Sequence, residues 1–388
     1  MFEQYNLQEI APFDDAQFHE KMTRLVEEPG FEHAVRWVLP DVDYPEFVRE
    51  LLQVPDKNTL QLKVMGPFLE LLAKKTTAGI TCDGIENVKE GISYTFITNH
   101  RDIVLDASFL NLCFIRHRMP TSEIAIGNNL LIYEWIADLV KLNKSFIVKR
   151  DLKMTQALKA AQQLSAYIHY AVMKKGESVW IAQREGRAKD SNDVTQESLM
   201  KMLALEGGGS TRDNLVNINL MPVSISYEYD PNDFLKAKEF LLKRKNPDYH
   251  KSQRDDLLSM ETGLLQYKGR VHFSLSPCIS DEIARIAPDT KRLEVIQQAC
   301  AMVDRRIHLR YHIYPINYIA ADLLNDNSAN ASHYTPVEAA DFKDYIEKQI
   351  DKVDLPDLTF GDRQYLRKMM FTMYSNPLYN KLAAERAK

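Results

Sequence analysis

Between residues 79 and 280, short apolar runs alternate with longer stretches in which apolar residues recur every three or four positions. Runs of the first kind are typical of buried strands, and the longer spacing is typical of amphipathic helices. The predicted strands are residues 80–82, 93–98, 123–126, 145–148, 178–182, 220–227 and 270–275. The predicted helices between them are chiefly residues 103–117, 130–140, 154–174 and 196–205. This alternation predicts an α/β fold with a mixed, largely parallel sheet flanked by helices.

The two ends of the chain show helical spacing without strands between. Before residue 79 the predicted helices are residues 14–28, 44–54 and 58–75, separated at Pro29, Pro40 and Pro55. Beyond residue 280 they include residues 311–324, 336–353 and 363–387, and Pro377 is expected to break the last of these. We therefore predict a helical N-terminal region (1–78), an α/β domain (79–280) and a helical C-terminal region (281–388).

Composition narrows the class of protein. Apolar residues make up 45% and charged residues 27% of the 388 positions, which is ordinary for a globular protein. A net charge of -5 gives no general attraction to nucleic acid. The four cysteines form no C-x-x-C pair, which argues against a zinc site or a disulfide framework and fits a reducing cytoplasm. We expect no secretory signal, because the first residues lack a basic start followed by an apolar core, and no bilayer-spanning helix, because nowhere do eighteen apolar residues run together.

His100 is the strongest candidate for a catalytic residue. It follows the predicted strand 93–98, at the sheet edge where ligands and catalytic groups collect, and Asp106 lies in the helix that comes next. A carboxylate bonded to one ring nitrogen leaves the other nitrogen as a general base. The nearby helix start also disfavours the imidazolium form. Asp102 is the rival for the aspartate role, with capping of the helix as its alternative.

Cationic residues follow two further predicted strands. Lys149 and Arg150 end the strand 145–148, and the planar guanidinium of Arg150 is suited to a phosphate group. Beyond the strand 178–182 comes Glu185-Gly186-Arg187, with Lys189 two residues later. Gly186 would let backbone N–H groups approach a ligand. Pro222 lacks a ladder donor, which predicts that the strand 220–227 lies at an edge or bulge facing a groove, with packing in the core as the alternative.

Four segments resemble, in order, the motifs of the glycerolipid acyltransferase superfamily, which includes glycerol-3-phosphate and 1-acylglycerol-3-phosphate acyltransferases. They are Asn99-His100 with Leu105-Asp106, the Phe146 to Arg150 strand, Glu185-Gly186-Arg187, and the strand around Pro222-Val223. The sequence departs from the family in two ways. Five residues separate His100 from Asp106 where the family has four, and Arg187 directly follows Gly186.

The resemblance implies roles for these residues. His100 and Asp106, or Asp102, would be catalytic. Substrate binding would fall to Arg101, Lys149, Arg150, Glu185, Gly186, Arg187 and Lys189 for the phosphorylated acceptor, and to Pro222 for the wall of the acyl site.

The resemblance also implies a reaction. An acyl group would pass from acyl-CoA or acyl-ACP to a hydroxyl of glycerol 3-phosphate or a lysophospholipid in phospholipid biosynthesis, without a metal or other cofactor and without nucleic acid. The expected location is cytoplasmic, with a membrane surface as a further partner.

Other functions stay open at this point. One is a catalytically inactive module of the same fold that binds membranes or carrier protein. Another is a metal-dependent hydrolase using His100, Asp102 and Asp106, and a third is an acyltransferase for an amino-acid lipid. Residues 365–382 mix Met and aromatic residues with basic ones, as an interfacial helix would, and a buried core helix is the alternative.

Overall fold

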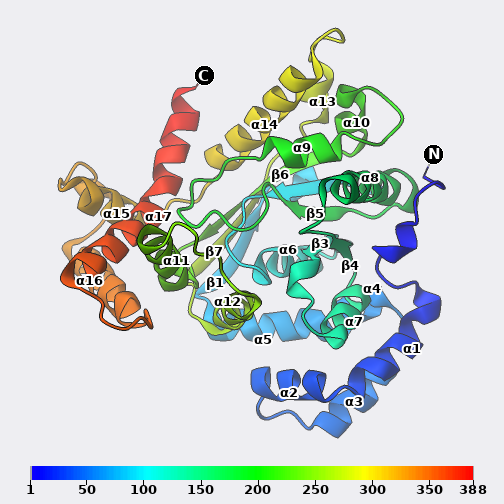
Figure 1. Cartoon of the computed structure of the whole chain (residues 1–388), viewed down its shortest axis with the longest axis horizontal. Helices are drawn as coiled ribbons and strands as arrows, with labels where there is room; N and C mark the ends of the chain where they lie inside the picture. Colours follow the sequence, from blue (N-terminus) through cyan, green and yellow to red (C-terminus); the bar gives the residue numbers. More distant parts are fainter. Residues whose placement is uncertain (1, 388) are drawn as a thin grey trace.

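The computed structural model describes residues 2–387 and is built around one seven-stranded sheet (Figure 1). The strand order is β1-β7-β6-β2-β5-β3-β4, and only the β6–β7 pair is antiparallel. The strands are β1 (Gly79–Asp83), β2 (Thr95–Thr98), β3 (Glu123–Gly127), β4 (Ser145–Val148), β5 (Val179–Ala182), β6 (Leu220–Tyr227) and β7 (Arg270–Leu275). The predicted fold class and all seven predicted strands are confirmed.

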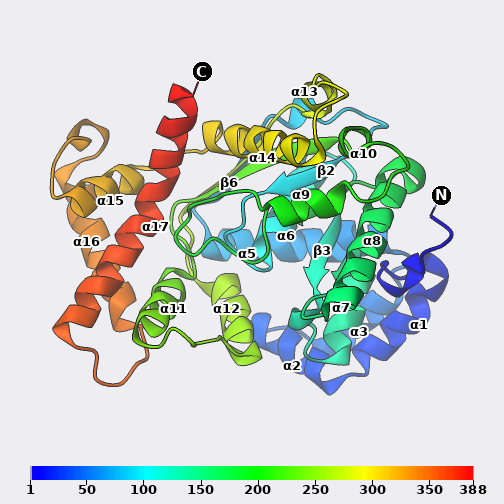
Figure 2. The same cartoon turned by 45° about the horizontal axis from the view of Figure 1, so that its top comes forward.

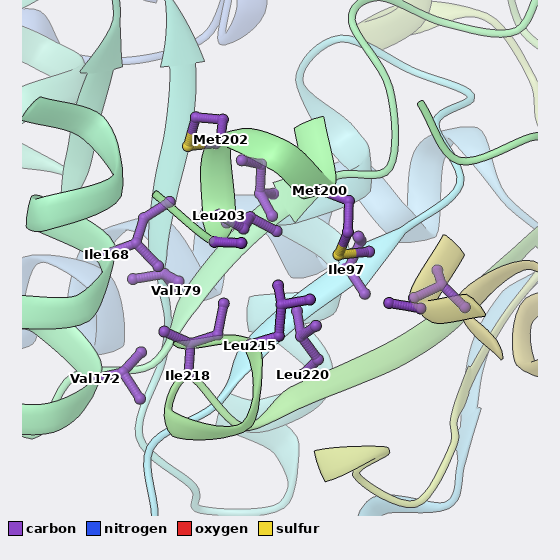
Figure 3. Close-up of a cluster of buried hydrophobic side chains, with 14 of the residues drawn as sticks. Ile97, Ile168, Val172, Val179, Met200, Met202, Leu203, Leu215, Ile218 and Leu220 are labelled. Carbon is purple, nitrogen blue, oxygen red and sulfur yellow. The ribbon is translucent and has the colours of Figure 1, made fainter. Parts of the chain in front are cut away.

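Alternate side chains of the strands enter two separate hydrophobic cores. In β2, Ile97 faces one core and Phe96 faces the other, as the two-residue period of a strand requires. Figure 3 shows the first of these cores, in which side chains from β2, β5 and β6 meet those of the covering helices. These helices are α8 (Met154–Tyr170), α9 (Glu197–Leu203), α10 (Thr211–Asn217), α13 (Ser280–Ala284) and α14 (Arg292–Leu309). The opposite face is covered mainly by α5 (Gly66–Thr76) and α6 (Leu105–Arg116).

Two smaller cores flank the sheet (Figures 1 and 2). The N-terminal core joins helix α7 (Glu134–Leu142) to helices α1 (Asp15–Val26), α2 (Pro29–Val38), α3 (Tyr44–Leu52) and α4 (Lys57–Leu60). The C-terminal core joins α11 (Asp233–Lys245) to helices α15 (Pro315–Asn325), α16 (Pro336–Asp351) and α17 (Phe360–Arg386). Helices α13 and α14, which follow residue 280, pack on the sheet and contribute to the first core.

Several helices differ from the prediction. Helix α2 begins at Pro29, which the pattern treats as a break; proline is well suited to a first helical turn. Helices α10, α11 and α12 (Gln253–Leu265) are not predicted either. Their apolar spacing is weak, and α12 is specified instead by a capping box in which Ser252 and Asp255 exchange hydrogen bonds.

The expected break at Pro377 is wrong, because α17 runs through it without interruption. Neighbouring carbonyl groups gain side-chain donors: Asn317 donates to the Tyr374 carbonyl at 2.7 Å and Ser375 to the Thr372 carbonyl at 3.1 Å. Leu366, Met370 and Tyr374 are buried in the C-terminal core, so the core-helix alternative holds for this segment. No helix among the described residues has the length and apolar content needed to cross a bilayer.

Candidate active site

The site begins where β2 leaves the sheet. The side chain of Asn99 donates to the Ile225 carbonyl at 2.9 Å and accepts from the Ile225 N–H at 2.8 Å. These bonds continue the pairing of β2 with β6 by one residue and fix the backbone before His100. The His100 ring lies edge-on to Trp180 of β5, with ring centroids 5.7 Å apart, and is 12% exposed. The imidazole is therefore held from one side and still reaches solvent.

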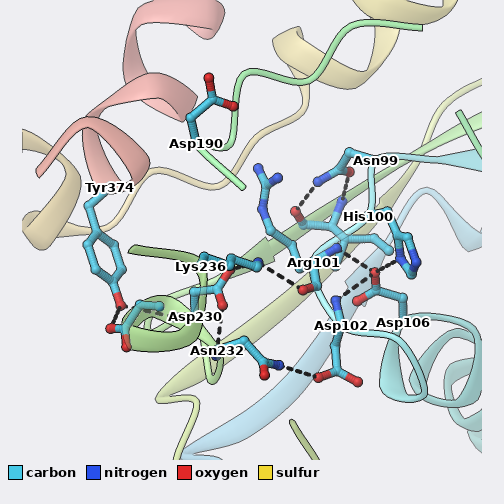
Figure 4. Close-up of polar contacts among 12 residues, drawn as sticks. Asn99, His100, Arg101, Asp102, Asp106, Asp190, Asp230, Asn232, Lys236 and Tyr374 are labelled. Atoms are coloured by element: carbon cyan, nitrogen blue, oxygen red, sulfur yellow. Dashed lines mark hydrogen bonds and ion pairs between the residues drawn. The ribbon is translucent and has the colours of Figure 1, made fainter. Parts of the chain in front are cut away.

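Asp106 is the carboxylate that meets His100, as preferred from the sequence (Figure 4). Its Oδ2 lies 2.8 Å from His100 Nδ1 and accepts the backbone N–H groups of Arg101 at 2.6 Å and Asp102 at 3.1 Å. Asp106 is fully buried in the first turn of α6, where the helix dipole favours negative charge. An ionised carboxylate can only accept hydrogen bonds, so Nδ1 carries the proton and Nε2 is the basic nitrogen.

Asp102 accepts hydrogen bonds from other groups than His100. Its Oδ1 accepts the backbone N–H groups of Val104 at 2.9 Å and Leu105 at 2.8 Å, at the start of α6. Its Oδ2 accepts from the side chain of Asn232 at 3.3 Å (Figure 4). Burial, together with the Asp106 charge, raises the pKa of Asp102. Asp102 therefore caps the helix that carries Asp106 and does not bond to the imidazole.

Arg101 was predicted to bind substrate, but the structure buries it in an internal ion pair. Its guanidinium bonds Asp193 through two nitrogens, at 2.8 and 2.6 Å. Burial opposes the charge, yet Asp193 holds the pKa of Arg101 above its usual value. The Tyr311 hydroxyl also donates to Asp193, and Lys236 donates to the Arg101 carbonyl at 3.0 Å. Arg101 is therefore a structural support of the loop that follows His100.

Arg150 and Glu185, from the second and third motifs, come together across β3. Arg150 Nε lies 3.7 Å from Glu185 Oε1, and both residues follow strands whose carboxyl ends share the sheet edge with His100. The guanidinium passes over Gly127 at the end of β3, where a Cβ atom would lie 2.8 Å from Nε. The absence of a side chain at Gly127 thus lets Arg150 reach toward β5. Lys149 turns away and pairs with Glu9 at 2.5 Å.

Arg187 and Lys189 face helix α11. Lys189 forms an ion pair with Glu239, and both Arg187 and Lys189 line a cleft beside that helix. Gly186 has a φ of 66°, in the left-handed region that favours glycine, and so turns the chain between Glu185 and Arg187. Lys149, Arg150 and Lys189 therefore pair with three different carboxylates, while Arg187 forms no ion pair among the described residues and lines the same cleft as Lys189.

The prediction that Pro222 faces a groove at a sheet edge is wrong. β6 is central, between β7 and β2, and every residue of it is buried. The Pro222 carbonyl accepts from the Ser276 N–H at 3.0 Å, just beyond the end of β7. The N–H and C=O of one strand residue point to the same side. The N–H that Pro222 lacks would therefore point toward the turn at Ser276 and not toward β2. Proline is tolerated there because the β7 ladder has already ended.

Several supporting residues have no local signal in the sequence. Asp193, Lys236 and Asn232 lie 92, 135 and 130 positions from their partners in the His100 loop. Asn99 is an exception, because its place directly before His100 points to a role in holding the backbone there. Among residues 2–387, no three His, Cys, Asp or Glu side chains come together in an arrangement suited to a metal ion.

Comparison with known proteins finds one family similar to the part of the chain that carries this site. Residues 79–226 match the family model described as Acyltransferase. A similar solved structure is the 1-acyl-sn-glycerophosphate (LPA) acyltransferase, PlsC, from Thermotoga maritima, with 11% identity and a TM-score of 0.40, covering 74% of this chain and 93% of that chain. Among curated proteins, none matches the chain significantly. The family match contains all four motif segments, so residues 79–226 are similar to the acyltransferase family in the part of the chain that carries the site.

Proposed function

We propose that the protein transfers an acyl group from an acyl thioester, acyl-CoA or acyl-ACP, to a hydroxyl of glycerol 3-phosphate or a lysophospholipid. The observation that carries this proposal is the contact of His100 Nδ1 with the buried Asp106 carboxylate. Two backbone N–H groups hold that carboxylate in place, so it orients the ring in every turnover without moving. The family match supports the reaction class.

His100 acts as the general base in this proposal. Its Nε2 takes the proton of the acceptor hydroxyl while the oxygen forms a bond to the thioester carbonyl carbon. The C–S bond then breaks, and the imidazolium returns its proton to the departing thiolate. The Asp106 carboxylate stabilises the imidazolium that forms between these steps. No acyl group becomes attached to the enzyme.

Arg150 and Arg187 supply the positive charge for phosphate-bearing substrates. Both follow strands that end at the same sheet edge as β2, and Arg150 is 28% exposed. Arginine binds phosphate oxygens through two nitrogens at once, which limits rotation of the bound substrate. Fixing the acceptor in this way brings its hydroxyl near both His100 and the thioester, which contributes to rate through orientation.

The test is release of free thiol from acyl-CoA in the presence of glycerol 3-phosphate. Loss of a general base costs about 100- to 10,000-fold, so we expect His100→Ala to lose activity in that range. Asp106→Asn should lose a similar amount, because an amide cannot stabilise the imidazolium. His19→Ala, on the exposed face of α1, is the matched control and should retain full activity. Circular dichroism confirms that each variant is folded.

The same assay separates the alternatives. Folded wild-type protein that releases no thiol with glycerol 3-phosphate, lysophosphatidate or an amino-acid lipid would favour the inactive binding module. Full activity in His100→Ala would remove the general-base assignment. Greater loss from Asp102→Asn than from Asp106→Asn would contradict the pairing observed here, in which Asp102 caps α6.

A further inference from the structure

A positively charged cleft lies between the loop after β5 and helices α11 and α12. Five cationic side chains and two carboxylates, Glu239 and Asp255, contribute to its lining. The cations are Arg187, Lys189, Lys236, Lys238 and Lys251. Four of the five are lysines, and three of those belong to the segment after β6. That segment lies beyond residue 226, outside the part of the chain that matches the family.

The charge of the cleft is only partly balanced by the protein. Lys189 shares Glu239 with Lys243, and Lys251 pairs with Asp256. Lys238 and Arg187 form no ion pair with any residue in the part of the chain described, and Arg187 Nη1 is buried there without a hydrogen-bond partner. Burial lowers the pKa of Lys189, and repulsion from Lys243 and Lys251 adds to this effect. An anion bound in the cleft would accept a hydrogen bond from Arg187 Nη1 and would reduce the repulsion between Lys189 and its lysine neighbours.

The cleft adjoins the loop that carries His100. Lys236 forms part of its lining and donates to the carbonyl of Arg101, the residue after His100. Helix α12 also contacts this loop, because a Cβ atom at Gly263 would lie 2.0 Å from Asp102 Oδ2. Figure 4 shows Lys236 between Arg101 and Asp230. Lys236 thus belongs both to the cleft and to the contacts that hold the loop after His100.

The chemistry of the cleft fits a phosphate monoester. Such a group carries about -1.5 to -2 charges at pH 7 and three acceptor oxygens. It can therefore accept from one guanidinium and from separate ammonium groups at the same time. Leu235, Leu242 and Leu258 supply apolar walls beside the cations, which suits a ligand whose phosphate continues into a less polar body.

We propose that this cleft binds the phosphate monoester of one of the two substrates, and that Lys238 and Lys251 of the α11–α12 segment select for it. The inference rests on the proposed function for the identity of the ligand. Two sources carry this group, the glycerol phosphate of the acceptor and the 3′-phosphate of CoA. Binding through residues outside the family-matched segment would let this chain choose its substrate independently of the shared motifs.

The experiment is a calorimetric titration of the full chain with glycerol 3-phosphate, CoA and dephospho-CoA. Lys238→Gln and Lys251→Gln remove one charge each and keep nearly the same side-chain length. A hydrogen bond between a lysine and a phosphate is worth roughly a tenfold change in affinity, so we expect about tenfold weaker binding of one ligand in each variant. Lys343→Gln, exposed on α16, makes the same charge change far along the chain and should bind like wild type.

The three ligands separate the two sources. Weaker binding of glycerol 3-phosphate alone assigns the cleft to the acceptor. Weaker binding of CoA, with dephospho-CoA unaffected, assigns it to the donor. The proposal would be overturned if Lys238→Gln and Lys251→Gln bound every ligand as tightly as Lys343→Gln does. It would also be overturned if wild type bound neither glycerol 3-phosphate nor CoA. Binding is measured without turnover, so the two proposals can fail separately. If ligand binding depends on Lys251 but the protein transfers no acyl group, the cleft proposal is supported and the proposed reaction is contradicted.

Discussion

Arg101 shows how one buried side chain can hold the loop between His100 and Asp106. Its backbone N–H donates to Asp106 and its carbonyl accepts from Lys236, while its guanidinium is bonded to Asp193. The position of the Asp106 carboxylate therefore depends on a buried ion pair between Arg101 and Asp193. From sequence, Arg101 is indistinguishable from a phosphate ligand, because the acid that neutralises it is 92 positions away.

Asp193→Asn should destabilise the fold and lower activity. The substitution leaves the Arg101 guanidinium buried without a counter-charge, which typically costs about 3–5 kcal/mol in the free energy of unfolding. Urea unfolding followed by circular dichroism measures this change. Asp344→Asn, at an exposed position of α16, is the control and should unfold like wild type. An unchanged midpoint for Asp193→Asn would show that the pair contributes no net stability.

At the scale of elements, the close approach of α12 to the His100 loop depends on a single glycine. Gly263 is buried, and an added Cβ would lie 2.0 Å from Asp102 Oδ2 and 3.2 Å from the side-chain nitrogen of Asn232. Asp102 cannot move freely, since it also caps α6. A displacement of Asp102 would therefore shift the first turn of α6, where Asp106 lies.

Gly263→Ala is expected to reduce kcat by at least about tenfold while the protein stays folded. Alanine favours helices by about 1 kcal/mol over glycine, so the backbone alone would gain from the change. Gly361→Ala in α17 is the matched control, because its nearest neighbouring atom would be 3.9 Å away. Steady-state thiol release measures kcat for both variants. Equal activity in the two would mean that the Asp102 loop accommodates the methyl group without moving Asp106.

Three prolines illustrate why local sequence rules can misplace the bounds and the setting of helices and strands. Local rules treat Pro29 and Pro377 as helix breaks and Pro222 as a sign of an edge strand. In the structure Pro29 starts α2, Pro377 lies within α17, and Pro222 is in the centre of the sheet. In each case the outcome depends on where the missing N–H would point and on which donors serve the neighbouring carbonyls. That information lies in the packing and not in the local sequence.

At the scale of the whole molecule, the C-terminal helices are joined to the α/β domain through Asp233. This first residue of α11 is fully buried and accepts from the hydroxyls of Tyr345 in α16 and Tyr374 in α17, both at 2.7 Å. Burial raises the pKa of Asp233 to about 6, and the nearby Asp230 adds to the rise. The folded state therefore binds this proton more tightly than the unfolded chain, in which the pKa is near 3.8.

The stabilising contribution of the Asp233 proton is complete below about pH 4 and is lost as the pH rises through about 6. The amide introduced by Asp233→Asn is uncharged throughout, so the stability of this variant relative to wild type should increase by about 2 kcal/mol between pH 4 and pH 7. Urea unfolding at intervals over this range measures the difference. Asp344→Asn, at an exposed position of α16, is the control variant. A flat profile for Asp233→Asn would mean that Asp233 is not protonated in the folded protein.

The sequence by itself determined the seven strands, the order of the four motifs, and the nearness of His100 to Asp106. These features are encoded locally, in apolar runs and in residues a few positions apart, so no knowledge of the packing was needed. Only the tertiary structure decided that Asp106 and not Asp102 meets the imidazole, that Arg101 is internal, and that Pro222 is central. It also decided that Lys189 turns to α11 while Arg150 turns to Glu185. Each of these depends on groups that the strand order brings together from distant parts of the chain, and such pairings leave no periodic trace in the sequence.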